Sequence, residues 1–266
     1  MQKIESDEVR FTESMLTQPP LSRWDVTTTL KHFAIVTYAV DPARVRPHVH
    51  DRFALETFTD EVGSAKAWVS MVPFEDQDFR FAGAPWLKFR FGQTNYRTYV
   101  FDGDTGQRLV WFFGTTLDSP TVALPRYVWK LPWHRGQIQF DCSYDSIHAR
   151  YAKYRMTTRS NWAPAELELD DCGLPVSELE GCADLESGLV ILTHPLCGVF
   201  YRRDGALGAY SIWHDRLQLS AARLVRAEIG LFDRLGLVSF GEQLHPHSIL
   251  MQHQTEFTIY LPPRRF

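Results

Sequence analysis

Residues 89–101 read FRFGQTNYRTYVF, and aromatic and β-branched residues are frequent among them. Such residues favour β-strands, and successive side chains of a strand point to opposite faces of the sheet. One face therefore carries Gln93, Asn95 and Arg97 between aromatic residues at both ends. Polar groups in the middle of an aromatic face indicate a special environment, because burying them without partners costs free energy.

Other strand patterns occur on both sides of this stretch. Residues 25–40, 64–74 and 107–117 are rich in β-branched and aromatic residues, and the third segment is apolar on both faces. Residues 75–86 are expected to be irregular. We therefore predict a mainly β fold of the α+β type, in which a closed or nearly closed sheet is accompanied by a few short helices.

The sequence contains fewer signals for helices and for domain boundaries than for strands. Asp41 and Pro42 are typical first residues of a short helix over 41–49. We expect a polar N-terminal arm over residues 1–23 and a single domain over residues 24–266. The acidic segment 157–187 is expected to be an irregular excursion on the surface.

Composition excludes several classes of protein. The chain has 266 residues, 44% hydrophobic and 23% charged, with a formal charge of -4, so it can bury a large core and is not disordered. This charge gives no reason to expect nucleic acid or an anionic membrane as partner. The apolar runs are far shorter than the roughly 20 residues of a spanning helix. Without a signal peptide or CxxC pairs, we expect a cytoplasmic protein with free thiols.

Several motifs in sequence order resemble the YqjF-like proteins, a poorly characterised branch of the acetoacetate decarboxylase-like superfamily. The motifs are YAVDPARVRPHV, AWVSMVPF, NYRTYV and LPRYVWKLPW within residues 24–156, followed more loosely by ILTHPLCGVF and SIWHDRL. The resemblance implies an acetoacetate decarboxylase-like β-barrel or cone that encloses a small-molecule cavity. Gln93, Asn95 and Arg97 would then be polar groups of an otherwise apolar pocket.

Arg97 needs a partner in such a pocket, because a buried guanidinium is costly when it is alone. The partner would be a protein carboxylate, several carbonyl groups or an anionic ligand. A structural ion pair with an Asp or Glu inside the fold and a contact with the ligand both remain open.

The chain departs from the decarboxylase at the catalytic lysines that the resemblance implies. Arg126 matches an arginine of the decarboxylase, and the Leu-Pro dipeptide at 131–132 matches its Phe-Pro. The two lysine positions that follow are Trp133 and His134, and neither side chain forms an imine. Lys130 lies just before the proline and is the alternative nucleophile, although it could also be a plain surface lysine.

These residues suggest an enzyme that works by acid–base chemistry without a Schiff base. We expect a keto or carboxylated apolar substrate and a reaction such as hydration, dehydration, isomerisation or cyclisation. His134 would transfer the proton, and Arg97 or Arg126 would hold a carboxylate or an enolate. The side chains expected to bind the substrate are Gln93, Asn95, Trp111, Tyr127, Lys130, Trp133 and His214.

The same residues are compatible with other functions. The protein could bind a small molecule without catalysis, or could decarboxylate a β-keto acid through Lys130. His134 could be a half-exposed loop residue, and His214 could simply bond to the backbone. The His-x-His pairs at 48–50 and 245–247 are interpreted as loop histidines rather than metal ligands. The sequence has no Gly-x-Gly-x-x-Gly or phosphate-binding loop, so no nucleotide cofactor is predicted. Unpaired sheet edges would allow a homodimer.

Overall fold

The computed structural model describes residues 9–120 and 123–266. Strands dominate this part of the chain, as predicted. They are β1 (Val26–Val40), β2 (Phe53–Leu55), β3 (Thr57–Thr59), β4 (Ala65–Phe81), β5 (Phe89–Asp102), β6 (Arg108–Leu117), β7 (Trp133–Arg135), β8 (Gln137–Asp145), β9 (Arg150–Arg159), β10 (Ala165–Pro175), β11 (Cys197–Tyr201), β12 (Leu207–Trp213), β13 (Ser220–Ile229) and β14 (Ser248–Arg265).

The helices are short, which also agrees with the sequence. They are α1 (Glu13–Leu16), α2 (Pro42–Val45), α3 (Ala123–Val128), α4 (Leu185–Thr193) and α5 (Gly230–Arg234), with 3-10 turns η1 (Arg46–His48) and η3 (Glu242–Leu244). Among the described residues, no helix combines the length and the apolar character needed to span a bilayer.

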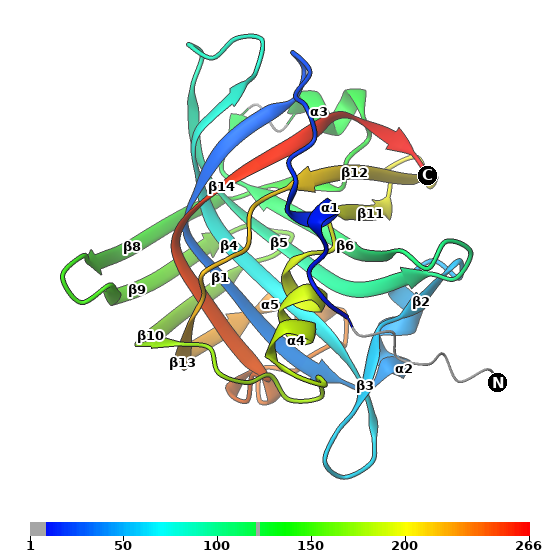
Figure 1. The fold of residues 1–266 in the computed structure, drawn as a ribbon, viewed down its shortest axis with the longest axis vertical. Coiled ribbons are helices and arrows are strands. Elements are labelled where there is room, and N and C mark those ends of the chain that lie inside the picture. Colours follow the sequence, from blue (N-terminus) through cyan, green and yellow to red (C-terminus); the bar gives the residue numbers. More distant parts are fainter. Residues whose placement is uncertain (1–8, 121–122) are drawn as a thin grey trace.

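A closed ring of strands forms the centre of the molecule (Figure 1). Its order is β1-β4-β5-β6-β11-β12-β14, and the pairing of β14 with β1 closes it. The pairs are antiparallel except β6 with β11, which is parallel. Closure satisfies the backbone groups that an open sheet would leave at its edges. This ring corresponds to the predicted cone.

A second sheet extends from the long strand β14. After β14 the order continues through β13, β10 and β9 to β8, and these strands project to one side of the ring (Figure 1). One prediction is corrected here, because residues 157–187 are not irregular throughout. Strand β10 crosses this segment, and its buried Ala165, Leu167 and Leu169 alternate with more exposed acidic residues.

Among the described residues, two large hydrophobic cores and a small third cluster around Phe91 and Leu117 follow from this arrangement. One lies between the ring and the second sheet and includes Tyr96, Met156 and Phe232. The other lies inside the ring, where helix α4 contributes Leu189, Ile191 and Leu192. Helix α4 (yellow-green in Figure 1) therefore packs its apolar side chains into this core.

A β-bulge next to Arg97 sets the register between β5 and β6. Tyr96 pairs with Gly114, but Arg97 pairs with Phe112, so one residue of β6 is skipped. Gly114 has φ +156°, and a Cβ atom there would lie 2.6 Å from the ring of Trp162. A bulge increases local twist and redirects neighbouring side chains. The glycine thus permits the turn of β6 that accompanies Arg97.

The N-terminal residues that the structure describes pack against the ring. The Phe11 backbone N–H donates to Glu186 Oε1 at 3.1 Å, and Gln18 donates to Thr258 Oγ1 at 2.9 Å. Tyr260 in turn donates its hydroxyl hydrogen to the carbonyl of Pro19. Residues 1–8 of the predicted arm lie outside the described part, whereas residues 9–23 run across α4 and β14.

Candidate functional site

A cavity of about 60 Å³ lies inside the ring. Its walls come from β1, β4, β5, β6, β12 and β14 and from the end of α4. Most lining side chains are apolar, among them Leu30, Phe33, Val72, Phe74, Phe112 and Phe257. A few polar groups interrupt this wall, which is the usual composition of a small-molecule site. They are Thr28, Asp76, Gln93, Asn95, Arg97, Thr193 and His214.

The polar row Gln93, Asn95 and Arg97 of β5 lies along the cavity. Gln93 Nε2 donates to Asn95 Oδ1 at 3.0 Å, and Thr115 Oγ1 donates to the same oxygen at 2.9 Å. Because this oxygen already accepts two hydrogen bonds, the Asn95 amide is held in one orientation. Its N–H groups remain as donors for a ligand.

Arg97 meets carbonyl and aromatic groups rather than a carboxylate. Its Nη2 donates to the Leu192 carbonyl at 2.8 Å, and its guanidinium lies 5.4 Å from the centre of the Tyr99 ring. Nε is buried without a partner, and no described carboxylate lies within 4.0 Å of the guanidinium. The structural ion pair considered above is therefore absent from the described residues. An uncompensated positive charge remains at the wall of an apolar cavity, where it favours an anion.

Asp76 is a second ionisable group of the cavity, and the sequence did not single it out. Strand β4 continues beyond residue 74, contrary to expectation, and carries Asp76 on the same inner face as Val72 and Phe74. Thr28 Oγ1 donates to Asp76 Oδ1 at 3.0 Å, whereas Oδ2 has no partner among the described residues. Burial raises the pKa of Asp76 to about 7, despite the hydrogen bond from Thr28.

His214 lies at the same cavity, but both of its ring nitrogens contact the backbone. Nδ1 is 2.8 Å from the Asp215 carbonyl oxygen, and Nε2 is 2.9 Å from that of Thr193. Burial lowers the pKa of His214 below its usual value, and the two carbonyl acceptors offset only part of this shift. The ring is therefore fixed in place and presents its carbon atoms, rather than a free nitrogen, to the cavity.

His134 is placed elsewhere by the structure. Its ring stacks on Trp162 with centroids 3.8 Å apart, and it does not line the cavity. Burial, followed by the charges of Arg126, Arg203 and Arg234, lowers the pKa of His134 to about 4. The ring is neutral at pH 7, and it packs against a tryptophan outside the apolar chamber. The structure thus does not bring His134 together with Arg97.

The remaining predicted residues around 126–133 also lie outside the cavity wall. Arg126 donates to the carbonyl of Trp133 at 2.9 Å, and Trp133 packs partly buried against the neighbouring cores. Tyr127 is 63% exposed, with the Arg203 guanidinium over its ring. Lys130 has φ +56°, and its carbonyl accepts from the Arg203 backbone N–H. None of the described residues that line the cavity is a lysine.

Trp111 was also expected at the cavity, but it faces the other core. It is buried between the rings of Phe53 and Tyr201. Its neighbour Phe112 lines the cavity instead, because adjacent residues of β6 point to opposite faces. The sequence left this choice open, since β6 is apolar on both faces.

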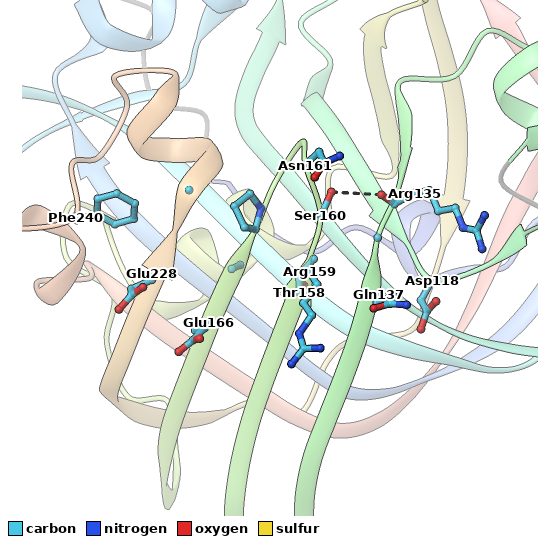
Figure 2. A pocket seen from close by; sticks show the side chains of 14 residues that line it. Asp118, Arg135, Gln137, Thr158, Arg159, Ser160, Asn161, Glu166, Glu228 and Phe240 are labelled. Carbon is cyan, nitrogen blue, oxygen red and sulfur yellow. Dashed lines mark hydrogen bonds between the residues drawn. The ribbon is translucent and has the colours of Figure 1, made fainter.

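An open depression of about 770 Å³ lies outside the ring, at the ends of β8, β9, β10 and β13 (Figure 2). Figure 2 shows Asp118, Gln137, Arg159, Glu166 and Glu228 spread along neighbouring strands rather than converging on one point. Most of these side chains are solvated. The smaller cavity is the better candidate, because its unpaired charged groups are buried.

No group of three or more His, Cys, Asp or Glu side chains is placed to hold a metal ion within residues 9–120 and 123–266. The cysteines at 142, 172, 182 and 197 are free thiols.

A comparison with protein family models assigns the chain to a family. Residues 27–255 match DUF2071, described as an uncharacterized conserved protein, and this match covers most of the sequence. The chain belongs to the DUF2071 family. A comparison with curated proteins found no match.

Solved structures with a similar fold include a biosynthesis enzyme, an acetoacetate decarboxylase and an acetoacetate decarboxylase-like enzyme. The enduracididine biosynthesis enzyme MppR complexed with pyruvate has a TM-score of 0.55 and 14% identity, covering 95% of this chain and 93% of that chain. Acetoacetate decarboxylase from Legionella pneumophila has a TM-score of 0.58 and 12% identity, covering 96% and 93%. An acetoacetate decarboxylase-like enzyme from Sphingomonas wittichii RW1 has a TM-score of 0.55 and 8% identity, covering 92% and 94%.

These likenesses confirm the predicted fold of this DUF2071 protein. At such low identity they establish the architecture and not the reaction. The assignment to the YqjF-like branch stays a prediction.

Proposed function

We propose that this DUF2071 protein is an enzyme that binds a small keto or carboxylated compound inside the ring and acts on it without a Schiff base. The observation that carries the proposal is the pairing of Arg97 with the fixed Asn95 amide at the wall of a buried apolar cavity. An anionic or carbonyl oxygen at this position would find a positive charge and N–H donors that are already oriented.

This arrangement suits a reaction that develops negative charge on a carbonyl oxygen. Donors fixed before the reaction stabilise an oxyanion without having to reorganise, and a cavity with little water strengthens the effect. The ligand should be small, because the cavity measures about 60 Å³. MppR, whose fold is similar, is described in complex with pyruvate, which is a compound of this class.

The absence of lysine from the described cavity wall supports chemistry without an imine. An imine requires a free amine within reach of the ketone carbon. Lys130 is held at the end of the α3 segment by its backbone contact with Arg203. Proton transfer beside a carbonyl, as in isomerisation or dehydration, needs only acid–base groups and an oxyanion site.

The proposal is tested by calorimetric titration with pyruvate, acetoacetate and 2-oxobutanoate. The variant Arg97→Met keeps the side-chain volume approximately and removes the charge, so we expect its affinity for the bound acid to fall by at least about tenfold, equivalent to about 1.4 kcal/mol. Arg223→Met is the matched control, since Arg223 is exposed on β13 and lies away from the cavity.

Equal affinity of Arg97→Met and the wild type would remove Arg97 from the site. If the wild type binds none of the three acids, the proposed substrate class is wrong. Saturable binding without any product in mass spectra would identify a binding protein instead of an enzyme.

A further inference from the structure

We propose, on the basis of the proposed function, that Asp76 is the group that takes and returns the proton in this cavity. The role of Asp76 follows from its position, its single anchoring contact and its distance from Arg97. No other carboxylate among the described residues lines the cavity.

The environment of Asp76 leaves one carboxylate oxygen available. The side chain is 1% exposed and lies on the inner face of β4, opposite Phe91 of β5. Thr28 Oγ1 is 3.0 Å from Asp76 Oδ1 and 3.2 Å from the Gln77 carbonyl oxygen, so its single hydrogen is shared between two acceptors. Oδ2 is buried and has no described partner. A buried polar atom without a partner is rare in proteins and requires an explanation.

Charged groups around Asp76 do not neutralise it. Glu75 points to the other face of β4 and pairs with Arg90 at 3.0 Å. Lys31 of β1 pairs in register with Glu75, so its side chain belongs to that same outer face. Phe91 of β5 and Leu30 of β1 are the direct neighbours on the inner face. Asp76 therefore meets apolar side chains and one hydroxyl, which favours its neutral form.

The register also keeps Asp76 away from the cation of the cavity. Asp76 pairs with Phe91, whereas Arg97 pairs with Ser70. Six residues of strand separate the two backbone levels, and the side chains of Asp76 and Arg97 contribute to the wall of the cavity from these levels. Gln93 and Asn95 occupy the interval. The two ionisable groups thus do not pair with each other, although both line the same cavity.

Proton abstraction next to a carbonyl group fits a cavity in which the carboxyl group of Asp76 and the cation of Arg97 are not paired with each other. The Asp76 carboxylate removes a proton from the carbon adjacent to the carbonyl, so a C–H bond breaks and an O–H bond forms on the carboxyl group. The electron pair forms a C=C bond, and the carbonyl oxygen becomes an oxyanion that the N–H groups of Asn95 stabilise. Arg97, beyond Asn95, holds the carboxylate of the acid. Return of the proton from Asp76 restores the carboxylate, and no further reactant is consumed. Burial raises the pKa of Asp76 to about 7, so both forms are present at neutral pH.

The probe for this step is the exchange of the methyl hydrogens of pyruvate in D₂O, followed by proton NMR. We expect the wild type to accelerate exchange and Asp76→Asn to slow it by about 100-fold, the lower range for a general base. The dissociation constant for pyruvate should hardly change, because Arg97 and Asn95 remain. Asp78→Asn is the matched control on the same strand, since Asp78 is exposed and pairs with Lys88.

Thr28→Val gives a second, independent test that retains the carboxyl group. Loss of the Thr28 hydrogen bond removes a contact that lowers the pKa of Asp76. The exchange rate should therefore reach its plateau at a higher pH than in the wild type. A role of Asp76 in packing alone would leave this pH profile unchanged.

The outcomes separate the two proposals. If Asp76→Asn exchanges pyruvate as fast as the wild type, Asp76 is not the base, while the binding site at Arg97 stands. If the wild type binds pyruvate but does not exchange it, the role of Asp76 is overturned and a binding protein remains. If the wild type does not bind pyruvate, both the substrate class and the proton transfer fail for this probe.

Discussion

At the scale of single residues, the ionisable groups of the cavity are placed where they cost stability. Arg97 has a buried Nε without a partner, and Asp76 has a buried Oδ2 without one. Either group would be cheaper on the surface or in an ion pair. Proteins commonly accept such costs at functional sites, which is why the proposed site is built on these two residues rather than on His214.

The pH dependence of stability should reveal Asp76 directly. Its pKa rises from 3.8 to about 7 in the folded protein, a shift worth on the order of 4 kcal/mol. Because the folded protein retains this proton and the unfolded chain releases it, the stabilisation is present at low pH. It is lost as the pH rises through about 7.

The substitution Asp76→Asn should remove the contribution of Asp76 to the pH dependence of stability. The difference in unfolding free energy between the variant and the wild type should therefore shift in favour of the variant as the pH rises from about 4 to about 8. Urea unfolding at several pH values measures this difference. A difference that stays constant across the range would mean that Asp76 is already charged in the folded protein.

At the scale of elements, the bulge between β5 and β6 determines where Arg97 lies. Gly114 combines φ +156° with a close approach of Trp162, so no other residue fits there without strain. The same tryptophan stacks on His134. This links the residues around position 134 to the ring as packing partners of β6, even though they do not reach the cavity.

Gly114→Ala should therefore be strongly destabilising. We expect a loss of about 2–4 kcal/mol in urea unfolding, because the new methyl group collides with Trp162 and the backbone is strained. Gly103→Ala is the control, since nothing lies within 4 Å of a Cβ atom at Gly103. Similar stability of both variants would show that β6 can shift at the bulge.

The strands also show which parts of the fold can be predicted from the sequence. The alternation of β5 predicted the shared face of Gln93, Asn95 and Arg97, because period-two patterns report strand faces directly. The same pattern in Ala165, Leu167 and Leu169 was hidden by the many acidic residues of that segment. Asp76 was missed because EDQD resembles a polar loop, and only the pairing of β4 with β1 and β5 shows which acid is buried.

In the molecule as a whole, the closed ring and the second sheet differ in how completely their strands are paired. Each ring strand pairs on both sides, whereas β8 pairs only with β9 within the described residues. The strand patterns of the sequence predicted a closed or nearly closed sheet, and the family resemblance added the enclosed cavity. It could not show that residues near 126–134 pack outside the cavity, because this depends on contacts between segments far apart in the chain.

Hydrogen exchange followed by mass spectrometry should distinguish the closed ring from the second sheet by the exchange rates of their backbone amides. Backbone amides of β4 and β5 should exchange only with global unfolding, while the β8–β9 hairpin should exchange earlier through local opening. Uniform protection of β8 would contradict this expectation. It would indicate that another chain covers this edge, as in the predicted homodimer.

The orientation of the Asn95 side chain has one consequence for selectivity. Its oxygen is occupied by Gln93 and Thr115, so together with Arg97 it offers hydrogens and positive charge but no acceptor. An amino acid carries an ammonium group where the corresponding 2-oxo acid carries an oxygen, and that ammonium would be repelled here. The protein should thus distinguish pyruvate from alanine, two molecules of nearly the same size, by the polarity of a single substituent.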